Sequence, residues 1–378
     1  CINLFKYPAN LMLMEPLEHY SQPHVIEAIL AISEDKEVVG SFGGQGYAKR
    51  PNTLMFPNDI IEQVKQGVTS FHISEETWRN VSALRPGMPP KEMDRLRKAW
   101  DLILDIDCKY LEYSKIAAHL LIQALDHLGI TSISCKFSGN HGFHIAVPFE
   151  AFPPIINNKP TATLFPEAPK YIAEYLKSLI EPDTPSEHSL SSHIMDYERK
   201  QNNMPNASAD DMLSIIQEKT QAPFEELVSQ YDDGLRFNAF NILEIDTLLI
   251  SSRHLVRHVY SINEKSGMIS LPINPFKVLD FDTKIAAIEQ KTKSRFKFLD
   301  RTQAHTNEAA RLFIQAYDYM QGTQKQQVRE RKPVEQLENA IPQTYFPDCI
   351  KQISAGLRDG RKRGLFILIN FLSSVGWS

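Results

Sequence analysis

The sequence contains few cysteines. Of its 378 residues only four are cysteines, at positions 1, 108, 135 and 349, and no two of them form a CxxC pair. Zinc sites built from cysteine need closely spaced ligands, so this spacing excludes a zinc knuckle made by these residues alone. We therefore expect no zinc. Scattered thiols without a pairing pattern favour a reducing, cytoplasmic compartment.

Long apolar runs and a strong net charge are also absent. No run approaches the roughly 18 apolar residues that span a bilayer, and the first residues lack the layout of a signal peptide. We therefore expect no membrane partner. The formal net charge is -5, which gives no global sign of a polyanion partner. A nucleic acid would have to be held by a local basic surface or through metal ions.

What the sequence does contain is typical of a globular protein. Hydrophobic residues make up 42% and aromatic residues 10% of the chain, which is enough to bury real cores in two or three domains. Residues 10–35 predict a helix, residues 37–56 a strand, a glycine turn and a strand, and residues 57–100 mostly helix and loop.

From residue 102 onward the pattern predicts alternating strands and helices. Residues 151–235 are polar and rich in Pro, Ser, Asn and Asp, which indicates an insertion with helices near 169–180 and 210–231. From residue 283 the chain is expected to be nearly all helix, interrupted by a charged linker. The remaining expected elements are a strand from 102, a helix at 113–128 ended by Gly129, strands at 132–137, 143–149, 241–250 and 267–273, a helix at 307–320 and the linker at 324–338.

Two carboxylates interrupt an apolar stretch, LILDIDCKY, at residues 102–110. Because successive side chains of a strand point to opposite faces, Asp105 and Asp107 share one face while Leu104 and Ile106 share the other. Two acids this close can hold or bridge divalent cations. The alternative is a pair of solvated acids at a strand end, and the spacing alone does not decide between them.

The segment CKFSGNHGFHIAV, residues 135–147, follows one helix and one strand later. Ser138 and Gly139 open a tight turn, Gly142 lets the backbone approach a ligand, and His144 begins the next strand. Such a turn offers backbone N–H groups, a hydroxyl and an imidazole to phosphate oxygens. The alternative is a glycine hairpin with a satisfied histidine.

A third segment, NILEIDTLLI at residues 241–250, places Asp246 in another apolar strand. Three carboxylates can hold two metal ions for in-line displacement at phosphorus. Downstream, Arg253, His254, Arg257 and Lys265 supply cations suited to a triphosphate. The alternative is a strand-edge acid followed by a solvated set of cations.

In this chain order the three segments resemble the motifs of the catalytic (small) subunit of archaeo-eukaryotic primases. LDIDC, FSGNHGFHI and LEIDT are similar to the family's hydrophobic DxD, SGxxGxH and hydrophobic-Asp motifs, and RHLVRHVYSINEKSGMISLP is similar to the stretch after the third. The resemblance covers roughly residues 36–275 apart from the insertion. It implies an α+β fold, with an RRM-like antiparallel sheet, a flanking α/β module and a helical C-terminal module.

The resemblance also implies a function and a set of site residues. The function is DNA-templated nucleotide transfer that makes primers, with single-stranded DNA as template and NTP or dNTP as substrate. Asn140 and His141 stand where the family often has arginines. The implied Mg²⁺ or Mn²⁺ ligands are Asp105, Asp107 and Asp246; the implied nucleotide contacts are Ser138, Gly139, Asn140, His141, His144, His254, Arg257, Tyr47, Lys49 and Arg50; and Lys265 is a template or primer contact.

The expected domains are a catalytic core at residues 1–290 and a helical extension at 291–378. From about residue 340 the chain resembles the start of the C-terminal domain found in the large subunit of primases, where a cysteine after Phe-Pro opens an iron–sulfur ligand set. The other three cysteines of that set do not follow Cys349, so no cluster is expected. The basic residues of this module are predicted to contact template or primer, the alternative being a solvated helix face: Arg358, Arg361, Lys362 and Arg363.

This interpretation predicts an archaeal or plasmid replication protein with a replicative helicase or other replication proteins as partners. Three alternatives stay open. One is a primer-extending polymerase of the same superfamily that does not initiate chains. The others are a DxD glycosyltransferase and a catalytically silent scaffold that binds nucleic acid.

Overall fold

The computed structural model describes residues 16–43, 45–156, 158–232, 234–246, 251–330, 340–356, 361–375 and 377. The side chains of residues 324–330 and 361–363 are outside this description. The chain divides into two compact units, Cys1–Met320 and Gln321–Ser378. Within the described residues, no helix combines the length and the apolar character that crossing a membrane requires.

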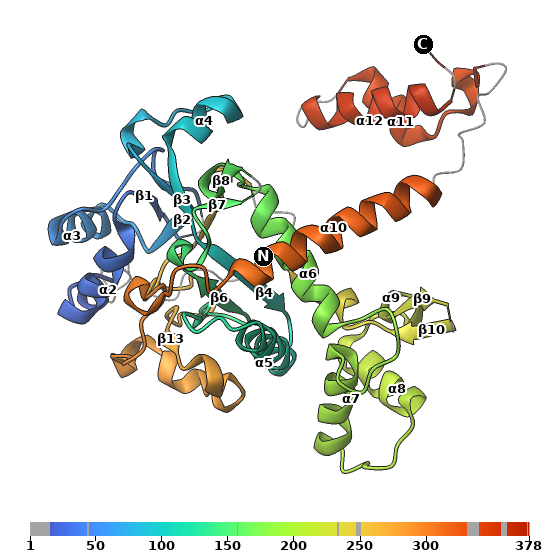
Figure 1. The fold of residues 1–378 in the computed structure, drawn as a ribbon, viewed down its shortest axis with the longest axis horizontal. Coiled ribbons are helices and arrows are strands. Elements are labelled where there is room, and N and C mark those ends of the chain that lie inside the picture. Colours follow the sequence, from blue (N-terminus) through green and yellow to red (C-terminus); the bar gives the residue numbers. More distant parts are fainter. Residues whose placement is uncertain are drawn as a thin grey trace, which may run out of the picture. The chain divides into compact units, whose positions relative to one another are not determined.

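A five-stranded sheet forms the centre of the first unit (Figure 1). Each neighbouring pair in it is antiparallel. Helix α5 (Leu111–His127) packs against β4 and β6 with an almost wholly buried face. The strand, helix, strand, turn and strand expected from residue 102 are thus confirmed. The strand order is β11 (Leu243–Ile245), β4 (Leu102–Cys108), β6 (Phe143–Val147), β5 (Ser134–Phe137) and β13 (Pro272–Ile273).

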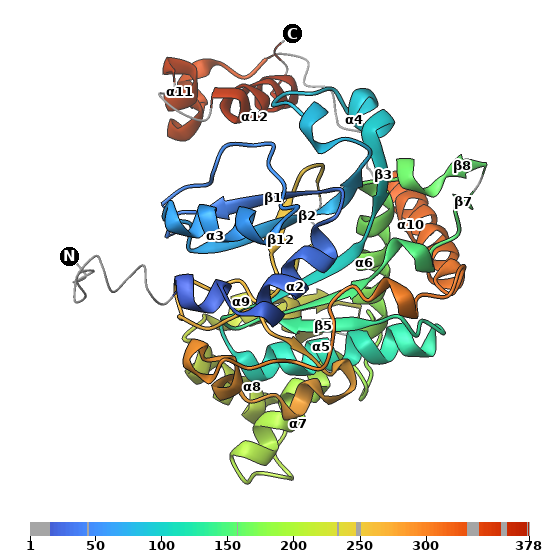
Figure 2. The ribbon, with the colours of Figure 1, turned by 90° about the vertical axis from the view of Figure 1, so that its left-hand side faces the viewer.

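A second antiparallel sheet belongs to the same unit (Figure 2). Its path is β1 (Lys36–Ser41), β2 (Ser70–Trp78) and β12 (Leu255–Arg257), and β3 (Arg97–Trp100) also pairs with β2. Helix α2 (Pro23–Ser33) packs against β1 and against α3 (Pro57–Lys65), and α4 (Pro90–Leu96) precedes β3.

Strand β2 corrects the expectation of mostly helix and loop at residues 57–100. Its sequence, SFHISEETW, is largely polar, yet every residue is buried. Ion pairs and hydrogen bonds make this burial possible, for example between Glu76 and Arg97 at 2.8 Å. The second strand expected within 37–56 is also wrong, because after the glycine turn only an isolated bridge forms between Ser41 and Tyr47 in the described residues.

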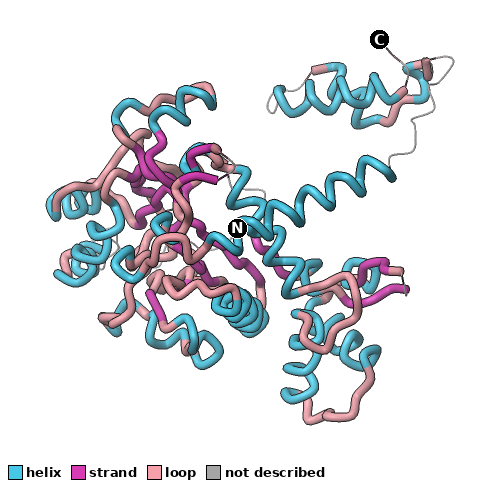
Figure 3. The backbone as a smooth tube through the Cα atoms, in the orientation of Figure 1, coloured by secondary structure: helices cyan, strands magenta, loops and turns pink. Residues whose placement is uncertain are grey.

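The insertion contains helices and two short hairpins (Figure 3). The helix expected at 210–231 ends at Thr220, because Gln221 adopts a left-handed conformation and Pro223 follows. The elements are β7 (Ile155–Ile156), β8 (Lys159–Pro160), α6 (Glu167–Ile180), α7 (Leu190–Gln201), α8 (Ala209–Thr220), α9 (Phe224–Leu227), β9 (Val228–Tyr231) and β10 (Gly234–Phe237).

After the insertion the strands are shorter than expected. Of residues 241–250 only β11 is described as strand, Asp246 follows it, and residues 247–250 are outside the described part. Residues 275–303 form short 3-10 turns, not the near-continuous helix expected from residue 283, and Lys291 and Leu299 have positive φ angles. The long helix α10 begins only at Ala310 and runs to Glu330, into the expected linker.

The described part of the second unit includes the end of α10 and the helices α11 (Asp348–Ala355) and α12 (Arg361–Ser374). Phe346 packs edge-on against Phe371 and Trp377, with ring centroids 4.9 and 5.7 Å away. The division between the units lies at residue 320, beyond the boundary expected near 290. Residues 291–301 belong to the first unit because they pack into it, as when Ser134 Oγ accepts the Leu299 N–H at 3.0 Å.

Candidate active site

The acid pair lies on the exposed face of β4. Ile106 and Cys108 are buried, whereas Asp105 is about one-third exposed and Asp107 is exposed. This confirms the predicted alternation. Asp105 is directly opposite His144 on β6, and Asp107 is directly opposite Glu244 on β11.

Asp246 follows β11 and lies beside Asp105. Its backbone N–H donates to the carbonyl oxygen of Asp105 at 2.9 Å. Because directly opposite residues of an antiparallel pair point to the same face, Asp246 shares a face with Asp105 and Asp107. Glu244, which the sequence did not single out, shares that face through its pairing with Asp107.

The glycine turn packs directly on β4 between the two acids. The Ser138 N–H donates to Gly142 O at 3.0 Å, and the Gly142 N–H donates to Ser138 Oγ at 3.2 Å. A Cβ added at Gly142 would lie 2.0 Å from the carbonyl oxygen of Ile106. Position 142 therefore requires glycine, and the close approach brings the turn beside the carboxylates.

A buried chain of polar side chains connects the turn with the acids. His144 Nε2 lies 3.2 Å from Asp105 Oδ1, and its Nδ1 lies 2.9 Å from Lys136 Nζ. Ser270 Oγ donates to the Phe137 carbonyl at 2.9 Å, so it accepts from Lys136, also at 2.9 Å. With Lys136 donating to Nδ1, the imidazole carries its proton on Nε2, which faces Asp105.

The charges of this chain of side chains are set by burial and by each other. Burial lowers the pKa of Lys136 to about 7 and also lowers the pKa of His144, against the attraction of Asp105. Burial alone would raise the pKa of Asp105, but His144 and Lys136 hold it below its usual value. Asp105 is therefore a carboxylate at neutral pH.

Nine of the predicted residues line one cavity of about 590 Å³. Residues of both sheets line this cavity. Asp105 belongs to β4 of the five-stranded sheet, whereas His72 of β2 and Arg257 of β12 lie directly opposite each other in the second sheet. Lys265, predicted as a template or primer contact, lies in this same cavity. The predicted residues that line it are Asp105, Asp107, Ser138, Asn140, His144, His254, Arg257, Lys265 and Tyr47.

Two cations of this cavity are positioned by acids, Arg257 by the partly buried Glu264 and His254 by the buried Glu75. Arg257 Nη1 lies 3.2 Å from Glu264 Oε2. His254 Nδ1 lies 3.6 Å from Glu75 Oε1. Burial alone would lower the pKa of His254, but Glu75, with Asp246 and Asp105 contributing, raises it. The raised pKa favours the cationic form of this imidazole beside the acids.

Other predicted residues lie outside the cavity lining: Gly139, His141, Lys49, Arg50 and Asp246. Arg50 instead forms two hydrogen bonds to the buried Glu37, at 3.0 and 2.8 Å, and so has a structural partner. Arg358 is outside the described residues, as are the side chains of Arg361, Lys362 and Arg363.

Two titratable residues of the cavity, His72 and Glu264, were not singled out from the sequence. His72 lies on β2, the strand that the sequence did not predict. Lys136, behind the cavity, was also missed. It had a usable signal, because it alternates with Ser138 as Asp105 alternates with Asp107.

The three aspartates fit a Mg²⁺ or Mn²⁺ site in donor type and backbone register, since both ions prefer oxygen ligands. Their side chains do not yet converge. In the described part of the chain, no three His, Cys, Asp or Glu residues are grouped closely enough to hold a metal ion. Asp105 is turned toward His144, so metal binding would require its carboxylate to rotate.

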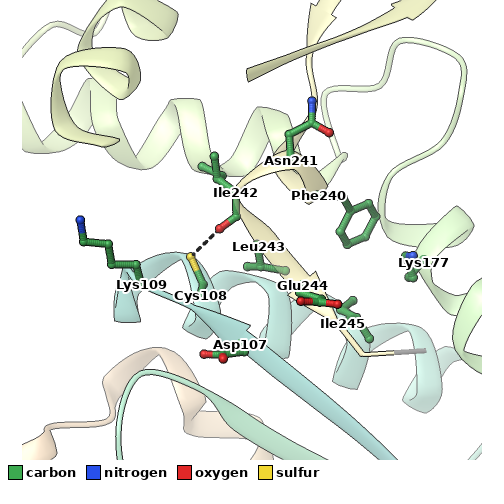
Figure 4. Close-up of a pocket in the computed structure, with 10 residues that line it drawn as sticks. All are labelled: Asp107, Cys108, Lys109, Lys177, Phe240, Asn241, Ile242, Leu243, Glu244 and Ile245. Carbon is green, nitrogen blue, oxygen red and sulfur yellow. Dashed lines mark hydrogen bonds between the residues drawn. The ribbon is translucent and has the colours of Figure 1, made fainter. Parts of the chain in front are cut away.

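A second cavity, of about 500 Å³, opens on the other side of Asp107 (Figure 4). It follows the outer edge of β11, from Phe240 to Ile245. Lys177 of α6 lies over the Phe240 ring at 5.1 Å, so the insertion forms one wall. Asp107 therefore borders two open spaces, one with the glycine turn and one with the insertion.

No family model matches the sequence, and no curated protein matches it. Among solved structures, the chain is similar to the polymerase domain of ligase D from Mycobacterium tuberculosis, solved in complex with DNA. The match covers 79% of this chain and 91% of that chain, at 13% sequence identity and a TM-score of 0.38. The mixed α and β architecture with antiparallel sheets follows from the strand pairing itself.

Proposed function

We propose that this chain is a DNA-templated nucleotidyltransferase that makes primers, with the core fold of the archaeo-eukaryotic primases. One observation carries the proposal. The register of β4, β6 and β11 sets Asp105, Asp107 and Asp246 on one face beside His144 and the glycine turn. The three sequence motifs thus meet at one place.

Each group has a role in this reaction. Asp105, Asp107 and Asp246 would hold Mg²⁺ or Mn²⁺, which when bound activates a 3′-hydroxyl and neutralises the pyrophosphate leaving group. His144 presents an Nε2–H toward the cavity, and Arg257 and Lys265 bring positive charge to the triphosphate. The Ser138–Gly142 turn orients phosphate oxygens through its backbone.

The decisive experiment supplies a single-stranded DNA template with NTPs or dNTPs, Mg²⁺ or Mn²⁺, and no primer. We expect labelled primers from the wild type. Asp105→Asn should reduce synthesis about a thousandfold, because the metal site supplies several kcal/mol of transition-state stabilisation. Thermal unfolding of the variant should stay cooperative but occur at a somewhat lower temperature, since Asn cannot replace the attraction of the Asp105 carboxylate for His144 and Lys136. Undiminished synthesis by this variant would refute the metal assignment.

The same assay separates initiation from extension. A primed template tests extension, and the primer-free template tests initiation. Products from the primed template alone would replace the primase proposal with a primer-extending polymerase. Running each nucleotide set separately measures the preference between NTP and dNTP.

A further inference from the structure

A short segment of the first unit, residues 291–299, alternates between exposed cations and inward-facing residues. Lys291, Lys293, Arg295 and Lys297 are exposed, whereas the residues between them are half-buried and Phe298 and Leu299 are buried. The segment is held in place, since the Ser294 N–H donates to the Tyr260 hydroxyl at 3.0 Å. Figure 1 draws it in orange.

Three of these cations lack an acidic partner among the described residues. Lys291 pairs with Glu18, but no carboxylate in the described part of the chain forms an ion pair with Lys293, Arg295 or Lys297. Elsewhere in the unit the buried Arg97 is paired, with Glu76 at 2.8 Å. In a chain with a net charge of -5, three such cations in one row form a local positive surface. We call Lys293, Arg295 and Lys297 the basic stripe.

An aromatic surface borders the basic stripe. Phe276 is 56% exposed. It lines a cavity of about 330 Å³ together with Arg295, Phe296 and Lys297. Cations beside an accessible aromatic ring are the combination by which proteins hold single strands, because phosphates meet the charge and bases stack on the ring.

The segment also connects to the candidate active site. Phe298, at its inner end, lies 5.2 Å from Lys136 Nζ, and Lys136 contacts His144. The basic stripe and the acid pair therefore belong to one continuously packed unit. A strand on the basic stripe would be held by the same body that carries the candidate active site.

We propose that the basic stripe and Phe276 form a binding site for single-stranded DNA. The inference rests on the proposed function for the identity of that strand, which is the template. Lys293, Arg295 and Lys297 neutralise successive phosphates, and Phe276 receives a base in the adjoining cavity. Binding of this kind depends on salt and tolerates any base sequence.

The test measures fluorescence anisotropy of a fluorescein-labelled oligo(dT) 20-mer against the full chain over a series of salt concentrations. The first variant carries Lys293→Gln, Arg295→Gln and Lys297→Gln, and the second carries Phe276→Ala. We expect the triple variant to bind about 100-fold more weakly near 0.1 M salt. Each lost phosphate contact reduces the slope of log K against log salt by roughly 0.7, so the slope of the triple variant should be smaller by about 2. Phe276→Ala should weaken binding about tenfold with the slope unchanged.

The matched control carries Lys91→Gln, Lys159→Gln and Lys200→Gln, which removes the same charge from exposed lysines of the same unit. The control should bind nearly as the wild type does. Equal weakening of the control and the stripe variant, an unchanged slope in the stripe variant, or tighter binding of duplex DNA would each overturn the proposal. Because this assay measures binding alone, its result can overturn the binding site without affecting the proposal of primer synthesis. A failure of primer synthesis likewise leaves the binding result unchanged.

Discussion

Gly142 has no room for a side chain. Its Cα faces the backbone of β4 between Asp105 and Asp107, where an added Cβ would lie 2.0 Å from Ile106 O. The close contact fixes how far the glycine turn stands from the acids. The two glycines of the SGxxGxH pattern are therefore needed for different reasons. Gly142 allows the close contact with β4, whereas Gly139 adopts a positive φ of 97°, a conformation that favours glycine.

Gly142→Ala is expected to push the turn away from β4. We predict a loss of about 2–4 kcal/mol in the free energy of unfolding, because the contact is with rigid backbone and not with a movable side chain. Urea unfolding measures it. Gly322→Ala is the control, because an added Cβ there meets nothing within 4 Å and alanine favours the helix. A variant at position 142 as stable as wild type would contradict the geometry.

Lys136 is a positioning residue in this arrangement, because it acts through His144. Its Nζ lies 2.9 Å from His144 Nδ1 and 2.9 Å from Ser270 Oγ. The hydrogen bond to Nδ1 keeps the proton of the imidazole on Nε2, on the side of Asp105 and the cavity. Asp105, 3.2 Å from Nε2, favours the same tautomer, and the positive charge of Lys136 opposes a second proton on the ring.

Lys136→Met is expected to raise the pKa of His144, because the charge of Lys136 lowers that pKa while Asp105 raises it. The ¹⁵N chemical shifts of the His144 ring nitrogens, followed against pH, should show the ring taking up its second proton at a higher pH than in the wild type. The KM for nucleotide should rise about tenfold, the cost of one weakened charge-assisted hydrogen bond, with a smaller change in kcat. Lys115→Met, a mostly buried lysine on α5, is the control. Unchanged ring shifts in Lys136→Met would rule out the positioning role.

A buried ion cluster joins separate elements at the start of β4. Asp101 is fully buried and lies 2.8 Å from both Lys36 of β1 and Arg301, while its Oδ1 accepts the Phe149 N–H at 3.0 Å. Burial alone would raise the pKa of Asp101, but Lys36 and Arg301 lower it to about 2. The cluster thus links β1 of the second sheet, the start of β4 in the five-stranded sheet, and Arg301 in the segment after β13.

Asp101→Asn should cost about 3–5 kcal/mol in the free energy of unfolding at pH 7, because the buried charge of Lys36 would lose its carboxylate partner and Arg301 would keep only Glu150. The lowered pKa means that this stabilisation is present above about pH 4, the unfolded value, and is lost as pH falls toward 2. Urea unfolding at pH 7, 5 and 3 should show the two proteins converging at low pH. A constant difference between them would contradict the assignment.

The elements differ in how well their sequences predicted them. β4, α5, β5 and β6 followed from alternation and helical spacing, because burial there is apolar and each element ends at a clear signal such as Gly129. β2 could not be predicted this way, since its buried residues are polar and are satisfied by partners far along the chain, such as Arg97 for Glu76. The 3-10 turns of residues 275–303 likewise depend on packing against other elements.

The sequence predicted where the acids and the glycine turn of the candidate site lie better than it predicted which other side chains contact them. Alternation placed Asp105 and Asp107 on one face, and register brought Asp246 and His144 beside them. The sequence could not show that Arg50 is held by Glu37, because the two residues meet only through the folded sheet. The alternation of Lys136 with Ser138 could have pointed to it, but its partner Ser270 belongs to a different segment and could not be predicted.

Across the whole molecule, charge is distributed unevenly. The net charge of -5 predicted no preference for polyanions, but the sum conceals a cavity with Arg257 and Lys265 and a separate basic stripe. Long-range attraction depends on such local surfaces and not on the total. Both surfaces belong to the first unit, so nucleotide and strand binding are expected without help from the second.

The position of the insertion has a consequence for chain design. β6 and β11 flank β4 and are both antiparallel to it, so they run parallel to each other. Parallel strands cannot be joined by a tight hairpin; the chain must travel back along the sheet and pass over β4 before Asp246 can take its place. Residues 148–242 therefore form a crossover connection that this strand order requires. Another connection long enough to cross β4 could replace them. A short turn could not, because it would leave Asp246 at the opposite end of the sheet from Asp105 and Asp107.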